Sequence, residues 1–195
     1  MCQSCDAALI RERSLIELNL IQDFPAGLDR LWAAFGREDY PRQKYLTLGA
    51  TAVRTGRLSA TAQAIDVELE RDMPVDPRRL PCWARMLIGS QQTVRHRSAW
   101  RRSGPTRATA ELDVSPVGLP ARAQGLGTTA ETSPGTTRMV LTWRLESNLP
   151  VIGQKVEQLF ADLIRTSLDA DHAFTLHYLE AEPQAAVGQF KTGGV

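Results

Sequence analysis

The chain has 195 residues, of which 43% are hydrophobic and 23% charged, a length and composition that fit one domain with a full hydrophobic core. Its 23 basic and 22 acidic residues give a formal net charge of +1, so no overall field attracts the protein to nucleic acid or to an anionic membrane. No window approaches the roughly 18 to 20 consecutive apolar residues of a membrane span. The N-terminus lacks the basic segment followed by an apolar segment that is typical of a signal peptide. We therefore expect a cytoplasmic protein without stable membrane insertion.

The cysteine content agrees with that compartment, because an odd number with one close pair is a poor disulfide framework. Cys2 and Cys5 form a C-x-x-C motif, but no second such motif or histidine pair completes a metal shell, and no strand precedes it as in redox folds. We predict neither a metal site nor a cofactor. The predicted boundaries are a flexible N-terminal extension over 1–13, one domain over 14–180 and a flexible tail over 181–195.

Hydrophobic periodicity predicts a strand followed by short helices at the start of the domain. Residues 15–24 alternate between apolar and polar side chains, which is typical of a half-buried strand. Pro25 ends this strand, and apolar residues over 28–35 then recur at helical spacing up to Gly36. A second short helical or irregular stretch begins at 39–41.

Alternating segments between residues 47 and 146 predict a consecutive antiparallel meander of strands. We expect a first strand around 46–54 and a turn at Thr55-Gly56. Cys82 is interpreted as a small buried hydrophobe at the start of a helical segment. The other segments of the meander are a strand over 60–72, the helical turns over 82–88, strands over 93–101, 107–114 and 121–131, and a last strand with Met139, Leu141, Trp143 and Leu145 on one face.

The last third of the chain predicts one long amphipathic helix. Asn148-Leu149-Pro150 is a start signal for a helix. The helix would run from Pro150 to about Tyr178 and would span roughly 40 Å at ~1.5 Å per residue, enough to lie across a sheet. Its apolar stripe comprises Ile152, Val156, Leu159, Phe160, Leu163, Ala170 and Phe174.

A run of arginines near Trp100 raises the alternative of a nucleic-acid face. It comprises Arg95, Arg97, Arg101, Arg102 and Arg107. In a meander, the outward stripe of Arg95, Arg97 and Arg101 would lie between two acidic stripes from the strands on either side. These stripes hold Asp66, Glu68 and Glu70 on one side and Glu111 and Asp113 on the other. Opposite charges across strands stabilise pairing by about 0.2 to 1 kcal/mol each. We therefore predict a solvated sheet exterior and no nucleic-acid partner.

Several short segments at the predicted turns and at the ends of helices and strands point to a known family. They are Phe24-Pro25-Ala26, Leu31-Trp32, Leu80-Pro81, Arg85-Met86-Leu87-Ile88-Gly89, Gly118-Leu119-Pro120, Leu149-Pro150-Val151-Ile152-Gly153 and Lys155-Val156-Glu157. With the order of elements, they make the chain resemble a bacterial family of unknown function within the START-like superfamily, also called SRPBCC, over about residues 14 to 180. The superfamily includes ligand carriers, lipid-transfer domains and aromatic polyketide cyclases.

The resemblance implies an α+β, helix-grip (START-like) fold, in which a curved antiparallel sheet of about seven strands wraps around a long C-terminal helix. It also implies a cavity between the sheet and the helix. Because the family has no assigned chemistry, the resemblance transfers no catalytic residue to this chain.

The first functional hypothesis is a carrier or sensor that binds a hydrophobic small molecule, namely a lipid, an isoprenoid or a polycyclic compound. This ligand would lie against inward-facing side chains of the sheet and the last helix. The alternative is that these side chains fill the core and leave no cavity. The candidate ligand-binding residues are Ile65, Val67, Leu69, Val94, His96, Ser98, Trp100, Leu112, Met139, Leu141, Trp143, Phe160 and Leu163.

Two other classes of function stay open. In a cyclase-type or dehydratase-type enzyme, His96 would act as general acid or base, although a lone inward histidine is also typical of a hydrogen-bonded core. His172 lies beside Asp171, which suggests a wet face of the last helix. A protein-interaction module without a ligand would use the short helix around Trp83 and Met86, which is equally suited to be a lid over the cavity. The sequence identifies no protein partner, and we lean against an enzyme.

Overall fold

The computed structural model describes residues 16–85, 88–147 and 153–181. Seven strands form one antiparallel sheet in the order β1-β7-β6-β5-β4-β3-β2. The strands are β1 (Ile16–Phe24), β2 (Ala52–Ala60), β3 (Ala64–Pro74), β4 (Gln91–Gly104), β5 (Arg107–Pro116), β6 (Ala121–Ser133) and β7 (Thr136–Ser147). The helices are α1 (Leu28–Phe35), α2 (Tyr40–Thr47), the 3-10 turn η1 (Pro77–Arg79), α3 (Cys82–Arg85) and α4 (Gly153–Ala181).

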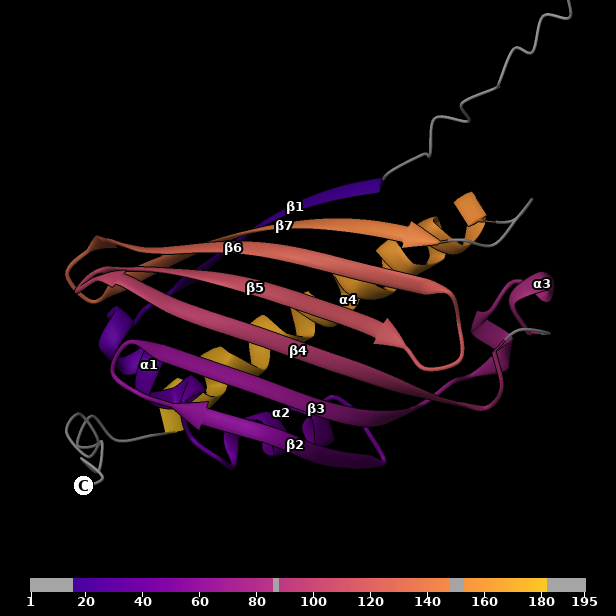
Figure 1. The fold of residues 1–195 in the computed structure, drawn as a ribbon, viewed down its shortest axis with the longest axis horizontal. Helices are drawn as coiled ribbons and strands as arrows, with labels where there is room; N and C mark the ends of the chain where they lie inside the picture. Colours follow the sequence, from indigo (N-terminus) through magenta and orange to yellow (C-terminus); the bar gives the residue numbers. More distant parts are fainter. Residues whose placement is uncertain (1–15, 86–87, 148–152, 182–195) are drawn as a thin grey trace, which may run out of the picture.

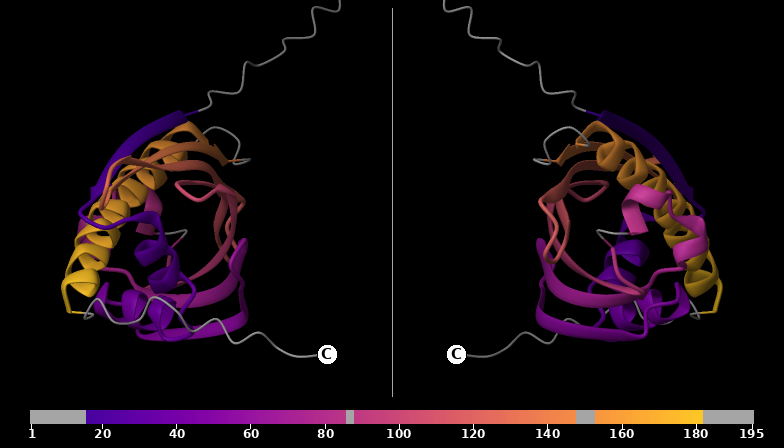
Figure 2. Two further views of the ribbon diagram at one scale, coloured as in Figure 1. Left: turned by 90° about the vertical axis from the view of Figure 1, so that its left-hand side faces the viewer. Right: turned by 90° about the vertical axis from the view of Figure 1, so that its right-hand side faces the viewer.

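The sheet curves around the long helix α4, which runs obliquely across its concave side (Figures 1 and 2). From β2 to β7 every strand pairs with the next one along the chain, and β1 closes the order by pairing with β7. Helices α1 and α2 lie on the same concave side, toward the part of the sheet formed by β2 and β3 (Figure 2). The predicted α+β helix-grip architecture is confirmed.

The inner face of the sheet combines small side chains on β6 with large ones on β7. On β6 the buried positions alternate through Ala121, Ala123, Gly125, Gly127 and Thr129, whereas on β7 they hold Thr137, Met139, Leu141, Trp143 and Leu145. A Cβ atom at Gly125 would lie 3.0 Å from three ring atoms of Trp143, and one at Gly127 would lie 3.1 Å from Leu141. The two glycines therefore make room for the large side chains of the neighbouring strand.

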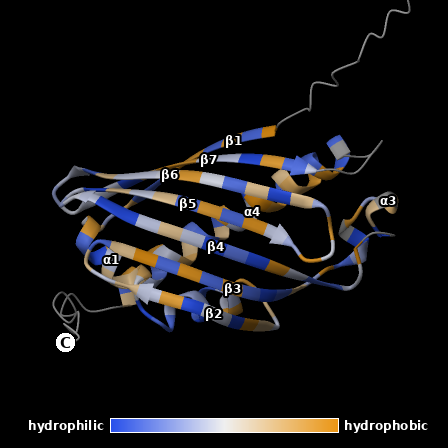
Figure 3. Ribbon diagram, in the orientation of Figure 1, coloured by the Kyte–Doolittle hydropathy of each residue, from blue (hydrophilic) through white to orange (hydrophobic). Residues whose placement is uncertain are grey.

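The outer face of the sheet carries cross-strand ion pairs between the arginines of β4 and the acidic stripe of β3. Hydrophilic and hydrophobic residues alternate along its strands (Figure 3). Nitrogen-to-oxygen distances are 2.9 Å for Arg95 and Glu70, 2.8 Å for Arg97 and Glu68, and 2.7 Å for Arg101 and Asp66. On the other side, Asp113 pairs with Arg122 of β6 rather than with β4. The arginine stripe is thus largely compensated by carboxylates of β3.

The start of the meander differs from the prediction. Helix α2 continues to Thr47 and β2 runs through Thr55 and Gly56, so the predicted strand over 46–54 and turn at these two residues are wrong. The pairing register of β2 with β3 shifts between Thr55 and Arg57, which places a bulge at Gly56. Glycine inside a strand often marks such a bulge. The turn into β3 lies at Thr61, whose backbone N–H and side chain bond Ala64.

The buried face of α4 also differs from the predicted stripe. Leu163 is 51% exposed and Ala170 is exposed, whereas Ala161, Ile164 and Leu179 are buried. Cys82, predicted to be buried, is exposed.

Several predictions lie outside the described residues: the extension over 1–13 with Cys2 and Cys5, the tail over 182–195, the helix start at 148–152, Met86 and the side chain of Trp83. In the described segments, no helix has both the length and the apolar character needed to cross a bilayer.

Candidate functional site

A cavity of about 510 Å³ lies between the concave face of the sheet and α4. Its wall is formed mainly by β3 to β7, α2 and α4, and by residues of the segment that joins β3 to β4. All of the predicted ligand-binding residues lie in this wall: Ile65, Val67, Leu69, Val94, His96, Ser98, Trp100, Leu112, Met139, Leu141, Trp143, Phe160 and Leu163. Their role in binding a ligand stays a prediction.

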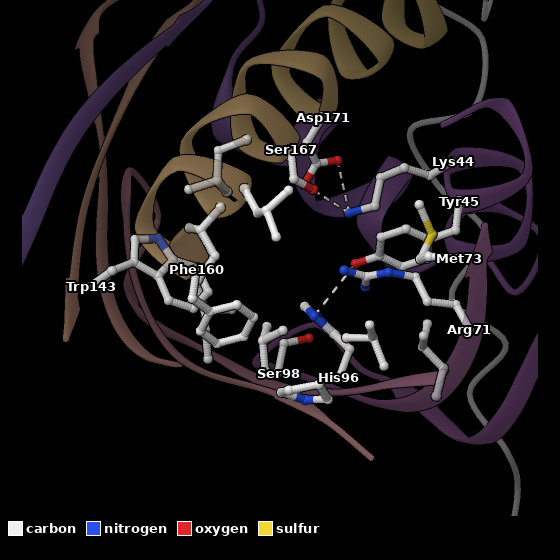
Figure 4. A pocket seen from close by; sticks show the side chains of 18 of the residues that line it. Lys44, Tyr45, Arg71, Met73, His96, Ser98, Trp143, Phe160, Ser167 and Asp171 are labelled. Carbon is white, nitrogen blue, oxygen red and sulfur yellow. Dashed lines mark hydrogen bonds and ion pairs between the residues drawn. The ribbon is translucent and has the colours of Figure 1, made fainter. Parts of the chain in front are cut away.

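The cavity has an apolar side and a polar side. Figure 4 shows Trp143 and Phe160 facing Lys44, Tyr45 and Arg71 across the open space. The apolar side consists of β7 and the first half of α4, and its indole and phenyl rings offer flat surfaces. The polar side is formed where α2 packs near β3 and β4, so an elongated molecule in the cavity would have one end at each side.

An ion pair between α2 and α4 forms one part of the polar side. The Nζ atom of Lys44 lies 3.0 Å and 3.2 Å from the two carboxylate oxygens of Asp171. The Lys44 and Asp171 side chains are 13% and 25% exposed. Burial alone would lower the pKa of Lys44, but the negative charge of Asp171 outweighs it, and the net effect raises this pKa. Lys44 is therefore a charged, paired group at neutral pH.

Tyr40 and Tyr45 surround this pair on α2. Lys44 Nζ lies 4.8 Å from the centroid of the Tyr45 ring and 5.4 Å from that of Tyr40, within the range of cation–π contacts. The Tyr40 hydroxyl lies 2.8 Å from Thr175 Oγ1 on α4. Because these contacts join α2 to α4, the two helices hold the polar side of the cavity in place.

Arg71 forms the second part of the polar side. It continues the inward series of β3 after Leu69 and is only 9% exposed. Its guanidinium carbon lies 4.1 Å from the centroid of the Tyr45 ring. Atom Nη1 is buried, and no described residue forms a hydrogen bond with it. Within the described residues, Arg71 forms no ion pair with any carboxylate.

His96 of β4 lies beside these two side chains. Its Nδ1 atom is 3.5 Å from the Tyr45 hydroxyl, which is at the long limit for a hydrogen bond. Burial, followed by the positive charges of Arg71 and Lys44, lowers the pKa of His96 well below its ordinary value of 6.5. The imidazole is therefore neutral at neutral pH, with one nitrogen able to donate a hydrogen bond and the other able to accept one.

Most of the polar side was missed by reasoning from the sequence. Lys44, Tyr45 and Arg71 were not predicted, and Asp171 was interpreted as part of a wet face although it lines the cavity. A signal was present for Arg71, because it follows Ile65, Val67 and Leu69 at a spacing of two residues and therefore faces the same side of the sheet. No comparable signal exists for Lys44, since its helix has no apolar stripe that separates a buried face from an exposed one.

Comparison with solved structures identifies the same fold in several proteins. The ZhuI aromatase/cyclase from Streptomyces sp. R1128 is 14% identical with a TM-score of 0.58, covering 90% of this chain and 99% of its own. TTHA0849 from Thermus thermophilus is 14% identical with a TM-score of 0.54, covering 85% and 98%. Ara h 8.0201 is 10% identical with a TM-score of 0.53, covering 84% and 99%. These similarities establish the START-like, helix-grip fold predicted from the sequence.

Comparison at the sequence level gives a family but no activity. Residues 19–179 match a family model described as Protein of unknown function (DUF2505). No curated protein matches the chain at a significant level.

Proposed function

Because the chain belongs to the DUF2505 family, whose description assigns no activity, we propose its function from its cavity. The protein binds a hydrophobic small molecule between the sheet and α4, as a carrier or a sensor. The observation that carries this proposal is the cavity of about 510 Å³. Close-packed interiors leave few voids larger than a water molecule, whereas ligand pockets occupy about 300 to 1,000 Å³.

The shape and chemistry of the wall support a ligand with an extended apolar body. Trp143, Phe160, Met139 and Leu141 offer aromatic and aliphatic surface without a charged group among them. A lipid, an isoprenoid or a polycyclic compound would bury its hydrocarbon there, and each buried CH₂ group contributes about 0.8 kcal/mol. Gly125 leaves room for the Trp143 ring, because a Cβ atom there would lie 3.0 Å from three of its ring atoms.

An enzyme of the cyclase or dehydratase type is the second candidate. The observation in its favour is the proximity of His96 and the Tyr45 hydroxyl at one point of the cavity. With its lowered pKa, His96 would serve as a base and would rarely carry the proton that a general acid needs. No carboxylate within the described residues orients the imidazole, so we rank binding ahead of catalysis.

Native mass spectrometry of the freshly purified protein tests the binding proposal. We expect a bound hydrophobic molecule, which solvent extraction then identifies unchanged. Thermal-shift assays with lipids and polycyclic compounds extend the test to protein that has lost its ligand. A protein that is empty and unaltered by every compound would refute the carrier hypothesis, and chemical conversion of the bound molecule would favour the enzyme.

A matched pair of variants tests where the ligand lies. Leu112→Trp would fill the cavity from β5, whereas Leu126→Trp makes the same change at a 61% exposed position of β6. We expect Leu112→Trp to lose the bound molecule and Leu126→Trp to keep it, with both proteins folded by circular dichroism. Equal retention in the two variants would place the ligand outside this cavity.

A further inference from the structure

Among the residues that the structure describes, Arg71 is a buried cation without a counter-ion. The residue is 9% exposed, and Nη1 is shielded from solvent without a hydrogen-bond partner in the part of the chain that the structure describes. Figure 4 shows its guanidinium group reaching toward His96 into the interior of the cavity. Stacking on Tyr45 compensates only part of the charge, because the unpaired burial of an ion costs several kcal/mol. An anion bound in the cavity would compensate the rest of this charge.

The other charged side chains of the cavity wall are already paired. Lys44 pairs with Asp171, and Asp76 accepts hydrogen bonds from the backbone and side chain of Arg78. His96 is neutral at neutral pH, because burial and its cationic neighbours disfavour the imidazolium. Of the described residues that line the cavity, this leaves one unpaired positive charge, that of Arg71. A monoanion would neutralise it, whereas a dianion would leave an excess negative charge in a poorly solvated site.

We propose that the cavity binds amphiphilic carboxylic acids, with the carboxylate held by Arg71 beside the Tyr45 hydroxyl and the hydrocarbon lying against Trp143 and Phe160. This inference rests on the proposed binding function and names its ligand class. The planar guanidinium fork matches a carboxylate with two parallel charge-assisted hydrogen bonds. The Tyr45 O–H supplies a further donor close to the same point, and His96 can donate another in one of its tautomers.

The test compares probes that share a hydrocarbon and differ in their polar group. Dissociation constants are measured at pH 7.5 by titration calorimetry for 1-pyrenebutyric acid and 1-pyrenebutanol, and for lauric acid, 1-dodecanol and dodecyl phosphate. Hydrogen bonds to a charged group contribute about 1.5 to 3 kcal/mol, so we expect each acid to bind at least about 10-fold more tightly than its alcohol. Lauric acid should also bind more tightly than dodecyl phosphate.

Two arginine variants show whether Arg71 is responsible. Arg71→Gln should reduce the difference between acid and alcohol to about threefold or less, leaving alcohol binding within a factor of about three. Arg57→Gln, at an exposed position of β2, should keep the wild-type ratio. If Arg71→Gln does not fold, Tyr45→Phe and Arg71→Lys replace it, and both should lower the ratio, since each loses part of the hydrogen-bonding group.

The outcomes separate this proposal from the one on which it rests. Equal binding of acids and alcohols would overturn the carboxylate assignment while leaving a hydrophobic carrier in place. Tighter binding of dodecyl phosphate would replace the carboxylate with a phosphate. An acid preference that survives Arg71→Gln would move the anion site elsewhere. Failure of every probe on both skeletons, in a protein that carries no ligand of its own, would overturn both proposals.

Discussion

The guanidinium carbon of Arg71 lies 4.1 Å from the centroid of the Tyr45 ring, while Lys44 Nζ lies 4.8 Å from the same centroid. One aromatic ring thus contacts two cations, of which only Lys44 has a carboxylate partner within the described residues. The hydroxyl of this ring faces His96. Tyr45 therefore contacts three other polar groups on this side of the cavity, namely Lys44, Arg71 and His96. Of the two cations among them, Arg71 is the one whose charge no described carboxylate neutralises.

Replacing Arg71 with methionine should stabilise the ligand-free protein. The substitution removes a buried unpaired charge and loses a cation–π contact worth about 0.5 to 2 kcal/mol, so we expect a net gain of about 1 kcal/mol in the free energy of unfolding. Urea denaturation of delipidated protein measures it. A loss of stability greater than about 1 kcal/mol would show that the charge is compensated in the folded state.

Gly125→Ala should destabilise the sheet, because the added Cβ would lie 3.0 Å from the ring of Trp143. Overpacking of this kind costs about 1 to 3 kcal/mol. Gly104→Ala is the matched control, since no atom lies within 4 Å of the Cβ position there. Urea denaturation, with Trp fluorescence as the probe, compares the two. A cost for Gly125→Ala no greater than that for Gly104→Ala would mean that Trp143 moves freely.

The ion pair of Lys44 and Asp171 should couple more strongly than an exposed pair of the outer sheet face. A double-mutant cycle with Lys44→Met and Asp171→Asn should give a coupling of about 1 to 3 kcal/mol, less than for a fully buried pair because Asp171 is partly exposed. The same cycle on Arg97 and Glu68, which are 59% and 41% exposed, should give about 0 to 1 kcal/mol. Equal couplings would contradict the burial of the first pair.

His96 should make the stability of the protein depend on pH below its ordinary pKa of 6.5. The unfolded chain takes up a proton near that pH and the folded protein does not, so stability falls as the pH is lowered from about 6.5. The slope attributable to this residue approaches about 1.4 kcal/mol per pH unit.

The difference between the stability curves of the wild type and His96→Gln isolates this effect. Chemical denaturation between pH 7.5 and pH 5 would provide both curves. We expect the difference curve to slope over this range, because only the wild type carries the His96 imidazole. A flat difference curve would show that this imidazole titrates equally in the folded and unfolded states.

Local patterns in the sequence were sufficient to identify most strands and helices and the apolar wall of the cavity. The alternation over β3 and β4 identifies which residues face the concave side, because side chains of a strand point to opposite faces in turn. The same rule fails where the backbone is irregular. Gly56 reads as a turn residue, but it lies inside β2 at a bulge, and only the pairing with β3 shows this.

The sequence by itself determined most of the order of elements and the inward-facing positions of the cavity residues, since these depend on periods of two and 3.6 residues, and its resemblance to a known family implied the helix-grip fold. Only the tertiary structure decided that Lys44 pairs with Asp171, 127 positions away, and that Arg71 has no carboxylate partner in the described residues. The physical reason is that these contacts depend on how far the sheet curves and where α2 packs against α4. Curvature and packing arise from the whole core, and no local pattern of residues encodes them.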